Sequence, residues 1–382
     1  MPCGLRSRGK FHASDATPHF HGFTPITART MPNTSACSLL LVQIPKLSFG
    51  FLPNYHCNQV FCLASGIWSV SVRYFLIIMK LRLLPILLFP LATAHATTTF
   101  GGGVNTFTMN FVTIGNPGNL ADDTGYGFVG YTYQMGVNEV SERMVNAYNA
   151  LSGGPTITKD TLGLDRPARS VSWNEAARFV NWLNTSSGYI AAYKFPTSGF
   201  NDNIGLWTVG DAGYDSSNPF RNANALYYLP SENEWYKAAY YDPNKSGGAG
   251  YWNYATGSDS APTAVSSGTT SGTAVYGGRP PADIMNAGGL SAYGTMAQNG
   301  NVFEWGKSAF TAPNDSAGES RVWRGGYFST TSNGLASSDR YSITPTLEND
   351  SVGFRVAAVP EPSAFFLTLL GMVGVLLRRK RG

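Results

Sequence analysis

Two segments carry hydrophobic residues at the spacing of a helix that buries one face. In residues 172–188 these positions are Trp173, Ala176, Ala177, Val180 and Leu183, and in residues 231–243 they are Trp235, Ala238 and Ala239. Each segment begins with a serine followed three residues later by a glutamate. This is the order of a capping box, in which the two residues satisfy each other's backbone N–H groups. The pattern predicts two core helices, with Glu175 and Glu234 as caps and not as catalytic acids.

Alternation of apolar with polar or small residues predicts short strands in three further segments. They cover residues 127–141, 321–328 and 351–359. Long stretches rich in Gly, Tyr, Asn and Ser, with few apolar anchors, occupy 197–225 and 243–280. Residues 100–359 are therefore predicted to form one irregular, loop-rich α+β domain that is long enough to bury a core.

The start of the chain has a different pattern. Residues 79–96 read MKLRLLPILLFPLATAHA, with a basic start, an apolar run and a small-residue cleavage pattern ending at Ala96. That is the order of a secretory signal peptide, and the apolar run is too short to span a membrane. Because a signal peptide belongs at the start of a chain, Met79 is expected to be the initiator. Residues 1–78 are then a mis-annotated extension of the gene, with a genuine N-terminal segment as the alternative.

Residues 360–382 combine a Pro-Glu-Pro tripeptide, an uncharged run and a basic tail. The run covers 363–377, which is short for a full span, and the cations after it favour a cytoplasmic end. This order resembles the PEP-CTERM sorting signal. The resemblance implies a short transmembrane sorting helix, cleavage by an exosortase-type protease, and delivery to the cell envelope, the surface or the extracellular matrix. The residues that carry it are Pro360, Glu361, Pro362, Arg378, Arg379, Lys380 and Arg381.

The charge and the residue content of the part between these ends exclude several kinds of binding and catalytic site. The whole chain has a formal net charge of +4, but residues 97–359 carry 15 Lys and Arg against 21 Asp and Glu, which gives about −6. An acidic domain without a basic stripe is not expected to bind nucleic acid. All four Cys precede Met79, and all five His lie at or before His95. After cleavage we expect no disulfide, no thiolate nucleophile, no Ser-His-Asp triad and no zinc or iron site of the usual kind.

Six segments occur in an order that resembles one protein family. They read YTYQMGVNEVSERMVNAYNAL, RPARSVSWNEAARFVNWLN, YYLPSENEWYKAAYY, NGNVFEWG, RVWRGGYFS and SVGFRVA. Together they span about residues 126–357 and resemble the sulfatase-modifying-factor family, the formylglycine-generating enzyme domain. The resemblance implies a variant of the C-type lectin fold that is loop-rich, with few helices and small twisted sheets.

The same resemblance argues against the activity of the family. Its enzymes oxidise a substrate cysteine to formylglycine with a copper ion held by two cysteines that closely follow the Arg-Gly-Gly motif. In this chain Thr330 and Leu335 stand at those places after Arg324. Neither supplies the soft sulfur that copper(I) needs. The sulfoxide-synthase relatives use a histidine-bound iron, partly from a second domain, and the predicted exported part has neither. A pseudoenzyme is therefore expected.

In the family, the segment that reads NGNVFEWG here helps to hold a calcium ion. Carried over by position, the ligands are the carbonyl groups of Gly300 and Val302 and the side chain of Glu304. These are oxygen ligands of the kind that calcium prefers. Ala297 stands where the family usually has Asp or Asn, so one side-chain ligand is lost unless a neighbouring asparagine replaces it. The resemblance thus implies at most a weak calcium site.

A purely structural interpretation of these motifs stays open beside the calcium site. Glu304 would then accept backbone N–H bonds while Phe303 and Trp305 pack in the core. Arg324 and Arg355 are each expected to pair with an internal carboxylate, with contact to a ligand as the alternative.

Two functions of different classes remain. The first is a surface-sorted binding or structural protein without catalysis, whose partner is extracellular polysaccharide or an envelope protein. Loop aromatics would stack on sugars or else serve as half-buried packing: Tyr214, Tyr227, Tyr251, Trp252, Tyr254 and Tyr276. The second is an enzyme. It is either an oxidase of the formylglycine-generating type or a hydrolase with two carboxylates from among Glu232, Asp242, Asp283, Glu304 and Asp339. A deep pocket with two close carboxylates would favour the enzyme, and a shallow aromatic face the binding protein.

Overall fold

The computed structural model describes residues 95–360 apart from 200 and 315. The chain divides into two units, 1–84 and 85–382, and only the second contains described residues. The predicted extension, nearly all of the predicted signal peptide and all of the predicted sorting signal except Pro360 therefore lie outside the described residues. None of the helices in the described part is long and apolar enough to cross a membrane.

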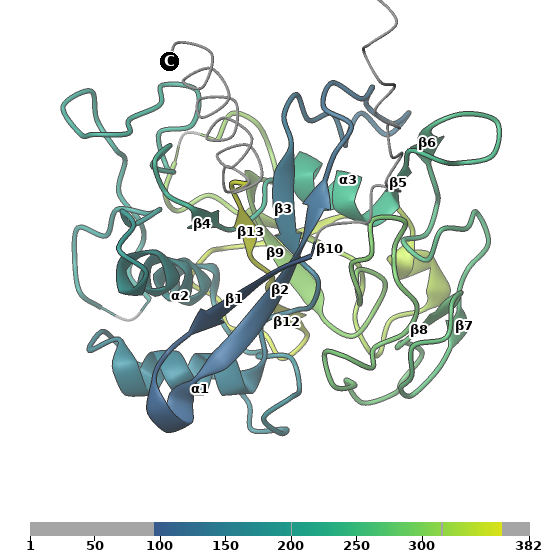
Figure 1. Cartoon of the computed structure of the whole chain (residues 1–382), viewed down its shortest axis with the longest axis horizontal. Coiled ribbons are helices and arrows are strands. Elements are labelled where there is room, and N and C mark those ends of the chain that lie inside the picture. Colours follow the sequence, from purple (N-terminus) through teal and green to yellow (C-terminus); the bar gives the residue numbers. More distant parts are fainter. Residues whose placement is uncertain (1–94, 200, 315, 361–382) are drawn as a thin grey trace, which may run out of the picture. The chain divides into compact units, whose positions relative to one another are not determined.

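A five-stranded sheet in the order β1-β2-β3-β13-β4 covers one side of the core (Figure 1). Its strands are β1 (His95–Phe100), β2 (Phe107–Ile114), β3 (Tyr133–Gly136), β13 (Ala357–Ala358) and β4 (Tyr227–Tyr228). All neighbouring pairs are antiparallel. The sequence did not lead us to expect the hairpin of β1 and β2, and the strand predicted over 127–141 is confirmed only at β3.

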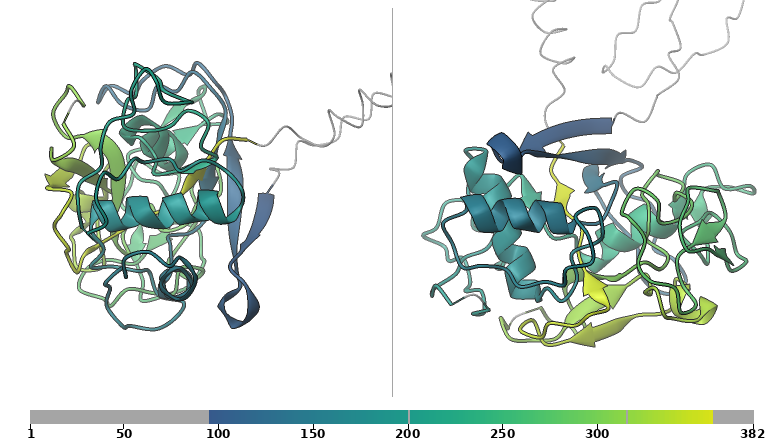
Figure 2. Two further views of the ribbon diagram at one scale, coloured as in Figure 1. Left: turned by 90° about the vertical axis from the view of Figure 1, so that its left-hand side faces the viewer. Right: turned by 90° about the horizontal axis from the view of Figure 1, so that it is seen from below.

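A second sheet has the order β11-β10-β9-β12. Its strands are β11 (Tyr341–Ile343), β10 (Arg321–Arg324), β9 (Phe303–Ala309) and β12 (Val352–Gly353). The β9–β12 pair is parallel and the others are antiparallel. The right-hand view of Figure 2 shows β10 and the hairpin of β1 and β2 on opposite sides of the domain, with the core between them.

Within residues 95–360, three α-helices lie among long loops. They are α1 (Glu142–Leu151), α2 (Trp173–Ser186) and α3 (Glu232–Tyr240). The two predicted helices, α2 and α3, are confirmed, and both capping boxes are present. Helix α1 was not predicted. The few helices and short strands agree with the predicted loop-rich α+β class.

No named helix or strand falls within the described residues of the loop predicted at 197–225. The loop predicted at 243–280 contains β6 (Gly250–Tyr251), which pairs antiparallel with β5 (Tyr241–Asp242) just before the loop, and the parallel pair β7 (Thr263–Ala264) and β8 (Thr273–Ala274). Two short 3₁₀ turns, η2 (Gly103–Asn105) and η3 (Ser332–Leu335), complete the described elements.

The two ends of the described domain lie close together. Residues 96–98 of β1 and residues 358–359, at the end of β13, line one small cavity of about 130 Å³. The N–H of Val359 also donates to the carbonyl group of Leu226, which precedes β4. The chain therefore enters and leaves the described domain beside the same small cavity.

Candidate functional site

The two positions that the resemblance assigns to copper-binding cysteines meet at Gly326. This glycine has a φ of 76°, and a Cβ built on it would lie 2.5 Å from Leu335 Cδ2 and 3.1 Å from Thr330 Cγ2. The turn η3 brings Leu335 back over the glycine, where its side chain is fully buried. The fold thus keeps these positions together but lines them with carbon atoms and one hydroxyl group. These residues do not fit a copper ion, because copper(I) needs soft sulfur ligands.

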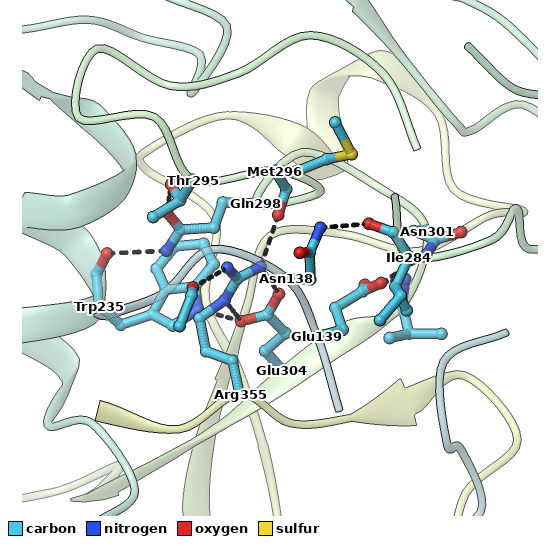
Figure 3. A network of polar contacts seen from close by, with 12 residues as sticks. Asn138, Glu139, Trp235, Ile284, Thr295, Met296, Gln298, Asn301, Glu304 and Arg355 are labelled. Atoms are coloured by element: carbon cyan, nitrogen blue, oxygen red, sulfur yellow. Dashed lines mark hydrogen bonds and ion pairs between the residues drawn. The ribbon is translucent and has the colours of Figure 1, made fainter. Parts of the chain in front are cut away.

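The Glu304 carboxylate is fully buried and bonded to side chains (Figure 3). Its two oxygens accept hydrogen bonds from Nε and Nη2 of Arg355, both at 2.5 Å, and Oε2 also accepts one from the indole N–H of Trp235 at 2.6 Å. The same guanidinium donates to the carbonyl groups of Gly136, Val137 and Met296 at 2.7–3.1 Å. The expected pairing of Arg355 with an internal carboxylate is confirmed. Glu304 accepts from side chains, however, and not from the backbone N–H groups that the structural interpretation expected.

This arrangement does not fit Glu304 as a calcium ligand. The Arg355 guanidinium, ringed by one carboxylate and three carbonyl groups, holds the position that a bound cation would take beside Glu304. The side chain of Asn301 is also engaged, since its Oδ1 accepts the N–H of Ala282 at 2.7 Å. Across the described residues no group of three or more His, Cys, Asp or Glu could hold a metal. Calcium at Gly300, Val302 and Glu304 stays a prediction, and it would require Arg355 to move away.

A second buried carboxyl group, Glu139, lies beside this pair and was missed by sequence reasoning. It accepts hydrogen bonds from Asn301 Nδ2 at 2.5 Å and from the N–H of Val302 at 3.3 Å. Burial, and then the charge of Glu304, raise the pKa of Glu139 well above its ordinary value. The site therefore has one guanidinium for two buried carboxyl groups.

Glu139 also lines a cleft of about 380 Å³ beside β2 and the start of α1. The polar residues of its lining are Thr108, Asn110, Asn138, Glu139, Ser141, Arg143, Asp165, Asp283 and Asn286. At the rim, Arg143 pairs with Asp165 and Arg166 pairs with Asp283, each at 3.1 Å. Amide, carboxylate and guanidinium groups of this kind both donate and accept hydrogen bonds, so the cleft suits a ligand rich in hydroxyl groups.

The predicted catalytic carboxylates are not gathered in one pocket. Asp283 is the single member of that set that lines the cleft, whose other carboxyl groups, Glu139 and Asp165, were not among the candidates. Glu304 is paired with Arg355, and Glu232 lies between Arg324 at 2.6 Å and Arg340 at 2.8 Å. The expected internal carboxylate for Arg324 is thus confirmed. The other two candidates accept from side-chain donors elsewhere: Asp242 from Trp252 Nε1, and Asp339 from the Tyr341 hydroxyl.

The loop aromatics predicted to stack on sugars are buried or half-buried, and stacking stays a prediction. Tyr227 is buried, and the other five are half-buried. Tyr251 packs on Tyr241 and donates its hydroxyl to the carbonyl group of Leu120, while Trp252 lies 4.1 Å below the Lys245 ammonium. Half-buried packing, the alternative role, describes these residues.

Comparisons with known proteins identify one matching family and several similar solved structures. A family model described as "Sulfatase-modifying factor enzyme 1-like domain" matches residues 104–359. Among solved structures, the chain is similar to Treponema denticola variable protein 1, with 19% identity over 69% of this chain and 99% of that chain, and a TM-score of 0.48. It is also similar to CarF, with 19% identity over 60% and 87% of the two chains and a TM-score of 0.43. For PvdO from Pseudomonas aeruginosa the identity is 16% over 70% and 100%, with a TM-score of 0.43. No curated protein matches the chain.

Proposed function

The chain belongs to the sulfatase-modifying factor enzyme 1-like family. We propose that it is nevertheless a binding protein and not a formylglycine-generating oxidase. The observation that carries the proposal is the contact of Thr330 and Leu335 with Gly326, at the positions where family enzymes hold copper. No cysteine follows Cys62 in the sequence, so no thiol of the domain replaces the missing pair.

The proposed place of action is outside the cytoplasm. The order of charge and apolar residues in 79–96 supports export, and the tripeptide, apolar run and basic tail of 360–382 support PEP-CTERM sorting by an exosortase-type protease. We also propose that the domain has a variant of the C-type lectin fold. Mass spectrometry of the native protein tests the sorting step, because removal of the tail near Pro360 is expected and an intact C-terminus would contradict it.

The proposed ligand is an extracellular polysaccharide bound in the cleft. Two features support this choice. The lining includes three asparagines and three acidic residues, and the exposed Asn286 makes no side-chain hydrogen bond to other described residues, so its amide is available to hydroxyl groups. Met285, 63% exposed, supplies an apolar surface beside it. A binding site that combines directional polar groups with an apolar contact is typical of small-ligand clefts.

The test is binding of the purified chain to a polysaccharide panel that includes the host's own matrix material. Asn286→Ala is expected to weaken binding about two- to tenfold, since a hydrogen bond contributes about 0.5–1.5 kcal/mol. Asn244→Ala is the matched control, because Asn244 is also exposed and lies outside the cleft. Binding to no polysaccharide, or an equal effect of both variants, would contradict the ligand class and leave an envelope protein as the partner.

Catalysis is tested with the same preparation. With copper supplied, the chain is expected to leave a sulfatase-type cysteine peptide unoxidised, and aldehyde formation would overturn the proposal.

A carboxylate-based hydrolase is the second candidate. It is favoured by the three carboxyl groups of the cleft, of which Glu139 has a raised pKa, as a general acid requires. Release of reducing ends from a bound polysaccharide would establish that activity.

A further inference from the structure

Two cationic side chains of the domain lack the partners that all the others have. Every other Lys and Arg of residues 97–359 donates to a carboxylate or a carbonyl group. Among the described residues, the side chains of Arg221 and Lys307 donate to no carboxylate and no carbonyl group. Nε and Nη1 of Arg221 are buried without an acceptor. Cations withdrawn from water are normally paired, so this exception needs an explanation.

The two cations lie at one aromatic ring. The Arg221 guanidinium carbon is 3.8 Å from the centroid of the Tyr228 ring, and Lys307 Nζ is 6.0 Å from the same centroid. Tyr228 comes from β4, Lys307 from β9 and Arg221 from the loop before β4. Both cations are half-buried, so the pair is within reach of solvent. The ring supplies cation–π attraction but no countercharge.

The nearby carboxylates are already engaged. Glu234 accepts hydrogen bonds from the N–H of Ser231 at 2.7 Å, the hydroxyl of Tyr131 at 2.7 Å and the hydroxyl of Tyr228 at 3.0 Å. Asp215 accepts from the N–H and the hydroxyl of Ser217. Neither forms an ion pair with Arg221 or Lys307. Burial and then the like charge of Arg221 lower the pKa of Lys307 to about 8, and the opposing charges of Glu234 and Asp215 only partly offset this.

We propose that Arg221 and Lys307 form a binding site for an oxyanion, namely a carboxylate, sulfate or phosphate group of a ligand. Glu234 is one carboxylate beside two cations, and a bound oxyanion would add a second negative charge and an acceptor for the guanidinium N–H groups. The site is local, because residues 97–359 as a whole are acidic and offer no long-range attraction for anions. It shares no residue with the polysaccharide cleft, so the inference does not depend on the proposed function.

Competitive labelling of amines tests the proposal on the unaltered chain. Lysines are acylated across a pH series with sulfate, phosphate or glucuronate, and with chloride at equal ionic strength to control for screening. An oxyanion beside Lys307 favours its protonated form and raises its pKa. At pH 8 the first unit of increase lowers its labelling about fivefold. Lys194, which already pairs with Asp211 at 2.9 Å, is expected to label equally in all solutions.

The three anions distinguish the source of the group. An effect of glucuronate alone indicates a carboxylate ligand, and an effect of sulfate or phosphate indicates the corresponding ester. No change in Lys307 labelling with any of them would overturn the proposal. In thermal unfolding, anion-induced stabilisation is expected to be lost in Arg221→Met and Lys307→Met and kept in the control Lys194→Met. Stabilisation that persists in Arg221→Met would place the anion elsewhere.

Discussion

Replacing Arg355 with Met tests the buried ion pair most directly. Both side chains of the pair are fully buried, and Glu304 would keep the Trp235 indole as its remaining side-chain donor. Removing one partner of a buried pair leaves an uncompensated charge and costs about 3–5 kcal/mol. The three carbonyl groups that Arg355 bonds would also lose a donor, at about 1 kcal/mol each. We therefore expect the free energy of unfolding to fall by about 4 kcal/mol or more at neutral pH.

The loss in this variant should depend on pH. Without Arg355 the buried Glu304 carboxylate has no countercharge in the folded state, and uptake of a proton removes this unpaired charge. A raised pKa contributes stability below the unfolded-state value, and that contribution is lost as the pH rises through the folded-state value. Arg355→Met is therefore expected to be less destabilised at about pH 5 than at about pH 8.

Urea unfolding followed by circular dichroism gives the required free energies. Four proteins are compared at both pH values: the original chain, Arg355→Met, Glu304→Gln and the double variant. The double variant should lose less than the sum of the single losses, with a coupling of about 0.5–3 kcal/mol, because it contains no buried charge. Additive losses, or a loss in Arg355→Met that is the same at both pH values, would refute the account of this pair.

Three further predictions concern other parts of the site. The pKa of Lys307, lowered to about 8, lies below its unfolded value of about 10.4, so between these values the unfolded chain binds more protons and stability should rise with pH. Urea unfolding across that pH range should show that the free energy of unfolding rises less steeply with pH in Lys307→Met than in the original chain. Equal slopes would contradict the lowered pKa of Lys307. Cysteines placed together at Thr330 and Leu335 are expected to bind copper(I), measured by competition with a chromophoric chelator. Failure to compete would show that the two positions do not form the family's metal pair. Removing calcium with a chelator should leave the melting temperature unchanged, since Arg355 already neutralises Glu304, and a clear fall would restore the calcium site.

The features that could be predicted from the sequence are those that depend on neighbouring residues. The two capped helices follow from serine, glutamate and apolar spacing within about one turn, and both were confirmed. The strand predicted over 321–328 ends at Arg324 because Gly325 and Gly326 have φ values of 95° and 76°. The pairing of Arg324 and Arg355 with carboxylates was predictable, but not which carboxylate each would meet.

The cleft could not be predicted, because it is assembled from segments that are far apart in the sequence. Its lining comes from residues 107–110, 138–144, 165 and 283–286. No local pattern marks Glu139, a lone glutamate after a strand, as a buried group that shares one guanidinium with Glu304. Unlike the cleft, the hairpin of β1 and β2 has a local signal in the sequence. Its second strand alternates clearly as FTMNFVTI, so that signal was present in the sequence and was overlooked.

The closeness of the two ends of the domain has a consequence for engineering. Because residues 96–98 and 358–359 line the same small cavity, a short linker between them could close the backbone into a ring, and new termini could then be opened in an exposed loop. For the same reason the domain could be inserted whole into a surface loop of a carrier protein without pulling the carrier's strands apart. Circular permutants opened near Gly247, in an exposed turn, are a practical starting point for displaying the cleft in either orientation.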